Sequence, residues 1–294
     1  MTAFRRSALG LFLMIWLGSN VVNAAVTITD DRGKTITLAH PATRIISLTP
    51  HLTELTFAAG AGGKLVGVSA FSDYPAAARQ RPVIGDFSKI DLERVSQLKP
   101  DLILAWISGN PRGDVERLEQ LGFKVVAFEP RKLDDIARHL LMLGELAGTS
   151  DEATRAASQY RSQMRLLESK YRVRQPVSVF YEIWHQPLMT IGQAHLVSRA
   201  IELCGGRNIF ADLPGLTPHV SLEAVMARQP QAIVASGALS AHETRLAPWH
   251  EQKSLQGLRQ AKLFYLDADT LHRATPRMAD GVRGLCETLD QARH

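Results

Sequence analysis

One group of side chains whose types and spacing could do chemistry is a pair of neighbouring carboxylates near the C-terminus. Asp267 and Asp269 follow an apolar run at 263–266 that reads as a strand, and paired acids at a strand end can act as general acid and base. No partner motif accompanies them. The run 60–63, Gly-Ala-Gly-Gly, lacks the Lys-Ser/Thr of a phosphate-binding loop, and no Gly-x-Ser-x-Gly turn occurs. We therefore favour carboxylates that hydrogen-bond a ligand, predict no catalytic residue, and keep an α/β enzyme as the weaker alternative.

Histidines are the second group with chemical potential. His51, His185, His219 and His272 all fall in expected loops, and a neutral imidazole can bind a metal or a haem iron. They form no local cluster along the chain, so for each one alone we favour an ordinary polar role and predict no metal site. If two of them converge in the fold, a haem or metal-chelate ligand becomes a candidate.

The elements that position these residues alternate between strand and helix in the first half of the mature chain. An alternating apolar pattern around Asp31-Arg32-Gly33 predicts a β-hairpin over 26–38. Short apolar runs predict buried strands at 44–48, 65–70, 102–106 and 124–128, with helices at 52–59, 92–98, 115–121 and 133–146. Such alternation is typical of an α/β fold with a mainly parallel sheet.

A long helix is expected next. Ala156, Tyr160, Met164, Leu167 and Tyr171 lie at helical spacing on one face, with neither Pro nor Gly between them. After Pro176 the alternation resumes, with strands expected at 177–184, 232–236 and 263–266 and helices at 196–203, 222–227 and 278–289. The fold class is therefore α/β: an N-terminal lobe (26–148) and a C-terminal lobe (175–294), joined by one rigid helix (149–174).

One sequence pattern occurs in both lobes. Residues 91–103, Asp-Leu-Glu-Arg-Val-Ser-Gln-Leu-Lys-Pro-Asp-Leu-Ile, resemble residues 221–233, Ser-Leu-Glu-Ala-Val-Met-Ala-Arg-Gln-Pro-Gln-Ala-Ile. Each copy predicts an N-capped helix that a proline ends before a strand. Each also carries one glutamate in the first helical turn, Glu93 or Glu223, where an acid favours the helix dipole. As a matched pair, the two carboxylates suit docking on a partner with two basic sockets.

The N-terminus predicts export. Arg5 and Arg6 precede a short apolar run that ends near Gly18, and small residues follow at Ala24 and Ala25. This is the layout of a cleaved signal peptide over 1–25, with an apolar run shorter than the roughly 20 residues of a membrane span. Its removal lowers the formal net charge from +5 to +3, since two arginines are lost. That charge is mild, and without a basic stripe we expect no nucleic-acid partner.

Only two cysteines occur, Cys204 and Cys286. In an exported chain, two cysteines favour one disulfide, although two buried free thiols stay an alternative. A two-cysteine metal site is less favoured because no second pair completes it.

The mature chain resembles a known family over nearly its whole length. It is similar to the periplasmic binding proteins with a rigid helical backbone, which serve cobalamin, haem, siderophore and metal importers. The similarity rests on five segments, which are 44–54 (Arg-Ile-Ile-Ser-Leu-Thr-Pro-His-Leu-Thr-Glu), 66–75 (Val-Gly-Val-Ser-Ala-Phe-Ser-Asp-Tyr-Pro), 98–106 (Leu-Lys-Pro-Asp-Leu-Ile-Leu-Ala-Trp), 204–210 (Cys-Gly-Gly-Arg-Asn-Ile-Phe) and 273–277 (Arg-Ala-Thr-Pro-Arg). The segments at 72–75, 105–110 and 204–206 look most like the cobalamin-binding branch.

This resemblance implies a function and a set of site residues. The implied function is capture of a corrinoid (cobalamin, a transported ligand and not a cofactor) by a periplasmic monomer that delivers it to the permease dimer of an ABC importer. In that branch the matched glutamates dock on permease arginines, which implies this role for Glu93 and Glu223, and the matching cysteines form a disulfide. The resemblance also implies a ligand cleft between the lobes. The implied ligand contacts are Phe71, Phe87, Trp106, Met189, Thr217, Asp269, His272 and Arg273.

Four of these positions depart from the family pattern. Phe71 and Phe87 stand where the branch has Tyr and Trp, Thr217 where it has Trp, and Met189 where it has Phe. A phenylalanine still offers a flat apolar face to a macrocycle, but it cannot donate a hydrogen bond. A haem or iron-siderophore ligand of the same importer class is therefore the alternative to a corrinoid.

Overall fold

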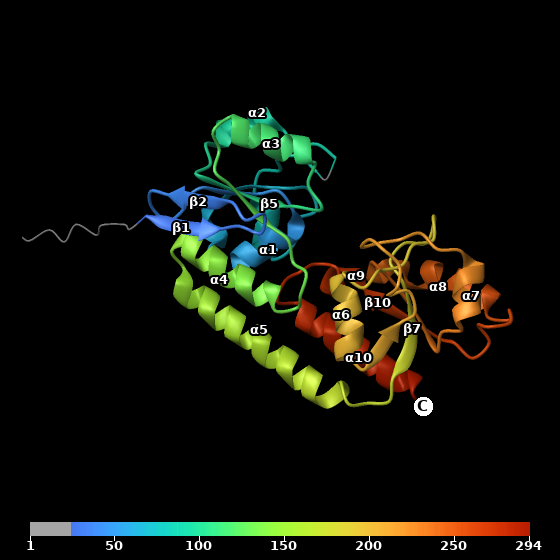
Figure 1. Cartoon of the computed structure of the whole chain (residues 1–294). Coiled ribbons are helices and arrows are strands. Elements are labelled where there is room, and N and C mark those ends of the chain that lie inside the picture. Colours follow the sequence, from blue (N-terminus) through green and yellow to red (C-terminus); the bar gives the residue numbers. More distant parts are fainter. Residues whose placement is uncertain (1–24, 87) are drawn as a thin grey trace, which may run out of the picture.

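The described chain forms two α/β lobes beside one long helix (Figure 1). The computed structural model describes residues 25–86 and 88–294. The signal peptide expected at 1–25 lies outside the described residues apart from Ala25, and Phe87 lies outside them as well. Within the described ranges, no helix combines the length and the apolar character needed to cross a membrane.

The N-terminal lobe is built on a parallel four-stranded sheet in the order β4-β3-β5-β6, with an antiparallel hairpin, β1-β2, next to α4. Its strands are β1 (Val26–Thr29), β2 (Thr35–Leu38), β3 (Ile45–Ser47), β4 (Leu65–Val68), β5 (Leu102–Trp106) and β6 (Val125–Phe128). Its helices are α1 (Pro50–Ala58), α2 (Leu92–Leu98), α3 (Arg112–Gln120) and α4 (Asp135–Ala147), with short 3-10 turns η1 (Gly62–Lys64) and η2 (Ala76–Gln80). The strands and helices predicted for this lobe are all confirmed.

The C-terminal lobe repeats the plan with a parallel sheet in the order β10-β9-β7-β8. Its strands are β7 (Val177–Glu182), β8 (Gly206–Asn208), β9 (Ala232–Gly237) and β10 (Lys262–Asp267). Its helices are α6 (Leu196–Leu203), α7 (Leu222–Arg228), α8 (His242–Gln252), α9 (Ala268–Leu271) and α10 (Met278–Ala292), with the turn η3 (Leu239–Ala241). The sequence did not predict β8, α8 or α9; the first and last are very short, and α8 contains Pro248, which disfavours a helix interior.

The long helix α5 (Ser150–Tyr171) is a continuous helix of 22 residues, about 33 Å long at 1.5 Å per residue. It packs against α4 of one lobe and α10 of the other. Tyr160, Met164, Leu167 and Tyr171 are buried as predicted, but Ala156 is only partly buried, because Ala153 and Ala157 continue the buried face. The helix lies within the predicted connecting range 149–174, while the exact lobe limits stay predictions.

A buried ion pair joins the lobes directly. Glu54 on α1 is 3% exposed. Its carboxylate accepts hydrogen bonds from Arg277 Nε and Nη2, both at 2.7 Å, and from Thr275 Oγ1 at 2.6 Å. Both donors belong to the C-terminal lobe. Because a buried carboxylate without these donors would be strongly unfavourable, the three bonds fix one lobe against the other.

The sequence pattern shared by the lobes folds in the same way twice. Asp91 accepts a hydrogen bond from the Arg94 N–H, and Ser221 accepts one from the Ala224 N–H, so each side chain caps its helix. Lys99 and Gln229 end α2 and α7 in the left-handed region, with φ of 46° and 47°. Glu93 and Glu223 are both exposed. The two helices lie far apart, on the outer parts of the two lobes (Figure 1).

The two cysteines form a disulfide within the C-terminal lobe. Cys204 follows α6, Cys286 lies on α10, and both are buried. The crosslink closes a loop of 82 residues in sequence separation. In the chain-entropy model, a loop of this length stabilises the fold by about 4 kcal/mol.

Candidate functional site

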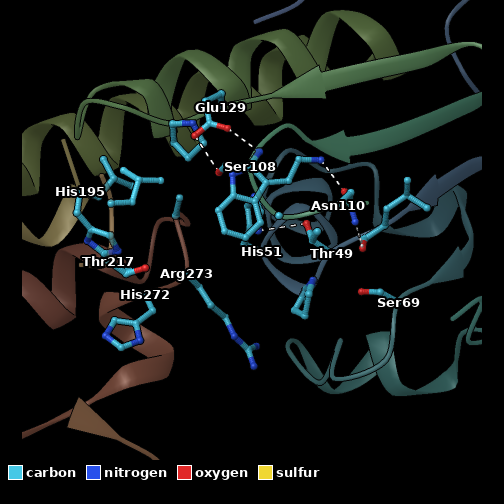
Figure 2. A pocket seen from close by; sticks show the side chains of 18 of the residues that line it. Thr49, His51, Ser69, Ser108, Asn110, Glu129, His195, Thr217, His272 and Arg273 are labelled. Carbon is cyan, nitrogen blue, oxygen red and sulfur yellow. Dashed lines mark hydrogen bonds between the residues drawn. The ribbon is translucent and has the colours of Figure 1, made fainter. Parts of the chain in front are cut away.

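A cleft of about 490 Å³ opens between the lobes. One wall consists of segments that follow β3, β4, β5 and β6 (Figure 2). The other consists of a residue that follows β7, the segment at the start of α6, the loop residues 216–217 before α7, and the segment at the end of α9. In a parallel sheet the carboxyl ends of the strands form the edge where ligands bind. Here several strand ends of both sheets contribute to one cleft, which has the size of a small-molecule site.

Phe71 lies at the mouth of this cleft in an unusual conformation. It lines the cleft, yet 72% of its surface is exposed, and its φ is 63°. The turn is held by a hydrogen bond from the Ala70 N–H to Gly85 O at 2.8 Å. A left-handed backbone is costly for a bulky residue and concentrates at functional sites. The turn therefore presents an aromatic face to solvent at the expense of backbone strain.

Trp106 forms a flat apolar surface inside the cleft. Its backbone N–H donates to Asn110 Oδ1 at 2.7 Å, and Asn110 Nδ2 donates to Leu48 O at 3.2 Å. The indole lies over Gly109, where an added Cβ would stand 1.8 Å from the ring. Position 109 therefore has to be glycine for the indole to keep this place.

Three histidines, His51, His195 and His272, line the cleft. Burial lowers the pKa of His51 and of His272 to about 3 and that of His195 to about 4, so all three are neutral at neutral pH. His195 Nδ1 accepts the Val197 N–H at 3.2 Å, which places the ring proton on Nε2. His51 Nδ1 lies 3.1 Å from Thr49 Oγ1. His185 and His219 do not line the cleft.

Arg273 is a cation of the cleft wall with two acidic partners. Its Nη1 lies 2.6 Å from Asp73 Oδ1 of the N-terminal lobe, and its Nη2 lies 3.1 Å from Asp269 Oδ1. Partial burial raises the pKa of Asp73, but the hydrogen bonds that its carboxylate accepts and the charges of Arg273 and Arg79 together outweigh this effect and hold the pKa below its usual value. The guanidinium therefore bridges the lobes beside the ligand space.

A buried carboxylate also lines the cleft. Glu129 follows β6 and is 8% exposed. The Ser108 N–H donates to its Oε2 at 2.9 Å, and Ser108 Oγ donates to its Oε1 at 3.1 Å (Figure 2). These bonds hold the carboxylate at the cleft wall.

The predicted ligand contacts fall into three groups. Phe71, Trp106, Thr217, His272 and Arg273 all line the cleft. Met189 does not line the cleft, and its backbone forms bridges to Trp184 and His219. Asp269 does not line it either, but its carboxylate forms an ion pair with Arg273, which does. Phe87 lies outside the described residues. The ligand-contact roles themselves stay predictions.

Several lining residues were not predicted as ligand contacts. They include Thr49, Ser69, Ser108, Asn110, Glu129 and His195. All but His195 follow the carboxyl ends of parallel strands, which is the signal that could have found them. Across the described ranges, no group of three or more His, Cys, Asp or Glu side chains could hold a metal ion.

Known proteins with the same architecture match this chain along most of its length. The model of the periplasmic binding protein family matches residues 45–270. A vitamin B12-binding protein of Vibrio cholerae is 39% identical over 249 residues, covering 85% of this chain and 90% of the relative. One from Yersinia pestis is 39% identical over 251 residues, covering 85% and 88%. The crystal structure of the periplasmic vitamin B12 binding protein of Vibrio cholerae matches with a TM-score of 0.80 and 38% identity, covering 86% of this chain and 98% of that one.

The strain at Phe71 can be tested by two substitutions. We expect Phe71→Gly to be more stable than Phe71→Ala by about 1–2 kcal/mol, because glycine adopts a positive φ without the clash that other residues suffer. Both variants lose the same exposed ring. Urea unfolding followed by circular dichroism measures the difference.

Leu166 provides the matched control, since it is 68% exposed in the middle of α5. There the glycine variant should be less stable than the alanine variant by about 0.5–1 kcal/mol. The same order at position 71 as at position 166 would contradict the strained conformation.

Proposed function

Because this chain belongs to the periplasmic binding protein family, we propose that it captures a corrinoid, cobalamin, between its lobes and delivers it to the permease of an ABC importer. The proposal places the mature protein in the periplasm as a monomer. Cobalamin is then a transported ligand and not a cofactor, and no bond of the ligand is made or broken. The family is one of binding proteins, which agrees with capture in place of turnover.

The observation that carries the proposal is the character of the cleft. Trp106 and Phe71 offer apolar aromatic faces, and the histidines around them are neutral. A corrinoid presents a flat macrocycle edged with uncharged amides, so it suits aromatic faces and neutral polar groups. The relatives named as vitamin B12-binding proteins share 39% of their residues with this chain over 85% of its length.

Ligand capture here needs only a small closure. A single continuous helix, α5, packs on both lobes, and the Glu54–Arg277 pair joins them directly. A domain pair held in this way moves less than one joined by several flexible strands. The cleft is therefore largely preformed before the ligand arrives.

A haem is the second candidate ligand, and the three histidines of the cleft favour it. A neutral imidazole can bind haem iron. His195 keeps its Nδ1 for the Val197 N–H, and His272 Nε2 lies 2.9 Å from the Tyr181 hydroxyl and 3.2 Å from Ser236 Oγ. His51 is therefore the residue to consider, since its Nε2 has no hydrogen-bond partner among the described residues.

Titration distinguishes the two ligands. Purified mature protein is mixed with cyanocobalamin, cobinamide and haem, with calorimetry and absorbance recorded in parallel. The corrinoid proposal expects saturable one-to-one binding of a corrinoid. No corrinoid binding, together with a shifted haem spectrum, would move the assignment to haem.

We further propose that Glu93 and Glu223 dock the loaded protein on the permease dimer. Both are exposed in the first turn of equivalent helices, one in each lobe. Glu93 lines a surface depression together with Asp91 and Arg94. Backbone and Ser221 hydrogen bonds lower the pKa of Glu223, so its charge is present at neutral pH.

Charge reversal tests the docking role. We expect Glu93→Lys and Glu223→Lys each to impair permease-dependent uptake, and the double variant to abolish it, while calorimetry shows the same corrinoid affinity. Exposed charges of this kind guide association and fix register. Glu145→Lys, an exposed reversal on α4, is the control. Normal uptake by the double variant would rule out the docking role.

The position of Trp106 makes a second prediction for binding. Gly109→Ala should weaken corrinoid binding about tenfold, because the new methyl group displaces the indole from the ligand face. Gly113→Ala is the matched control, since a Cβ there meets nothing within 4 Å. Calorimetric affinities that are equal for the two variants would show that Trp106 does not contact the ligand.

A further inference from the structure

We infer that the cleft selects its ligand by charge, and that Glu129 is the residue that rejects carboxylate-bearing macrocycles in favour of amide-bearing ones. This inference rests on the proposed function and adds a narrower ligand class to it. It depends on which charges the cleft wall offers and on which of them are already paired.

The positive charge of the cleft wall is already paired with carboxylates of the protein. Among the described residues that line the cleft, Arg273 is the only lysine or arginine. Its two terminal nitrogens lie at 2.6 Å from Asp73 and at 3.1 Å from Asp269, and its side chain is 14% exposed. A ligand carboxylate would have to displace one of these acids to reach the guanidinium. The cleft therefore offers carboxylates no ready counter-charge.

The negative charge of the wall is held in place. Glu129 is buried, and both of its oxygens accept hydrogen bonds from Ser108, which fixes them at the cleft wall. Arg131 Nε lies 3.4 Å from Glu129 Oε1, but half of the Arg131 side chain is exposed, so solvent screens this pair. A ligand carboxylate nearby would face a like charge inside a partly water-excluded space, where repulsion is strong.

The remaining polar groups of the cleft are uncharged. The three lining histidines are neutral, and His51 Nε2 and Trp106 Nε1 have no hydrogen-bond partner among the described residues. An amide brings both a donor and an acceptor without net charge, so it can bind such groups and can also donate to the Glu129 carboxylate. A carboxylate cannot donate in this way.

The test compares ligands that differ by one group. Cyanocobalamin and its three monocarboxylic acids, in which one propionamide of the corrin is hydrolysed, are titrated calorimetrically against the wild-type protein. We expect at least one acid to bind about tenfold more weakly than the amide, because its carboxylate faces Glu129. For each variant the ratio of acid to amide dissociation constants is the readout, since a general loss of binding alters both constants.

Two variants should lower this ratio by different routes. Glu129→Gln removes the repelling charge at nearly the same shape, and Asp73→Asn removes one of the two carboxylate charges that neutralise Arg273. Glu145→Gln, which removes one exposed charge away from the cleft lining, should leave the ratio as in wild type. If the wild type shows no preference, charge selection is overturned. If Glu129→Gln leaves the ratio as in wild type, the role of Glu129 is overturned, whatever the result for Asp73→Asn. Failure of cyanocobalamin itself to bind is a separate result that refutes the proposed function.

Discussion

The carboxylate of Glu54 receives three hydrogen bonds from the opposite lobe, and the geometry of the cleft depends on them. Two come from Arg277 and one from Thr275, all at 2.6–2.7 Å. These donors have to stay in place, because the loss of a donor would leave a buried carboxylate without full compensation of its charge. The pair lies on α1 and just before α10, close in sequence to His51 and Arg273. The contact that joins the lobes therefore also sets the distance between the two cleft walls.

The cleft combines strain and constraint around its aromatic residues. Phe71 is held in the left-handed region, and Trp106 keeps its place because residue 109 has no side chain. The left-handed backbone of Phe71 and the glycine at position 109 both lower local stability, and each fixes the orientation of an aromatic ring. The polar groups beside them are either neutral, as the histidines are, or already bonded, as Glu129 and Arg273 are. Such a site arranges its groups before the ligand enters, which limits the ordering that binding requires.

The sequence predicted those parts of the fold that local physics determines. The hairpin, the main strands and the repeated capped helices with Glu93 and Glu223 depend on nearby residues, and they were all predicted. The helix α8 was missed because Pro248 weakens its local signal, and tertiary packing of Leu246 and Trp249 decides it. The placement of His195 and Met189 depends on how separate segments meet. Spacing along the chain does not show which distant segments come together, so His195 was not predicted as a cleft residue, and Met189 was predicted as one but does not line the cleft.

The disulfide between Cys204 and Cys286 makes the two halves of the protein unequal. Both cysteines lie in the C-terminal lobe, and the sequence contains no other. The crosslink restricts the unfolded chain of that lobe alone, so the other sheet depends on packing and hydrogen bonds. Opening under heat or mechanical load should thus begin at β3–β6, as an ordered sequence of partial unfolding and not as one event. In an oxidising compartment, the lobe with α10 therefore keeps a covalent constraint that the other lobe lacks.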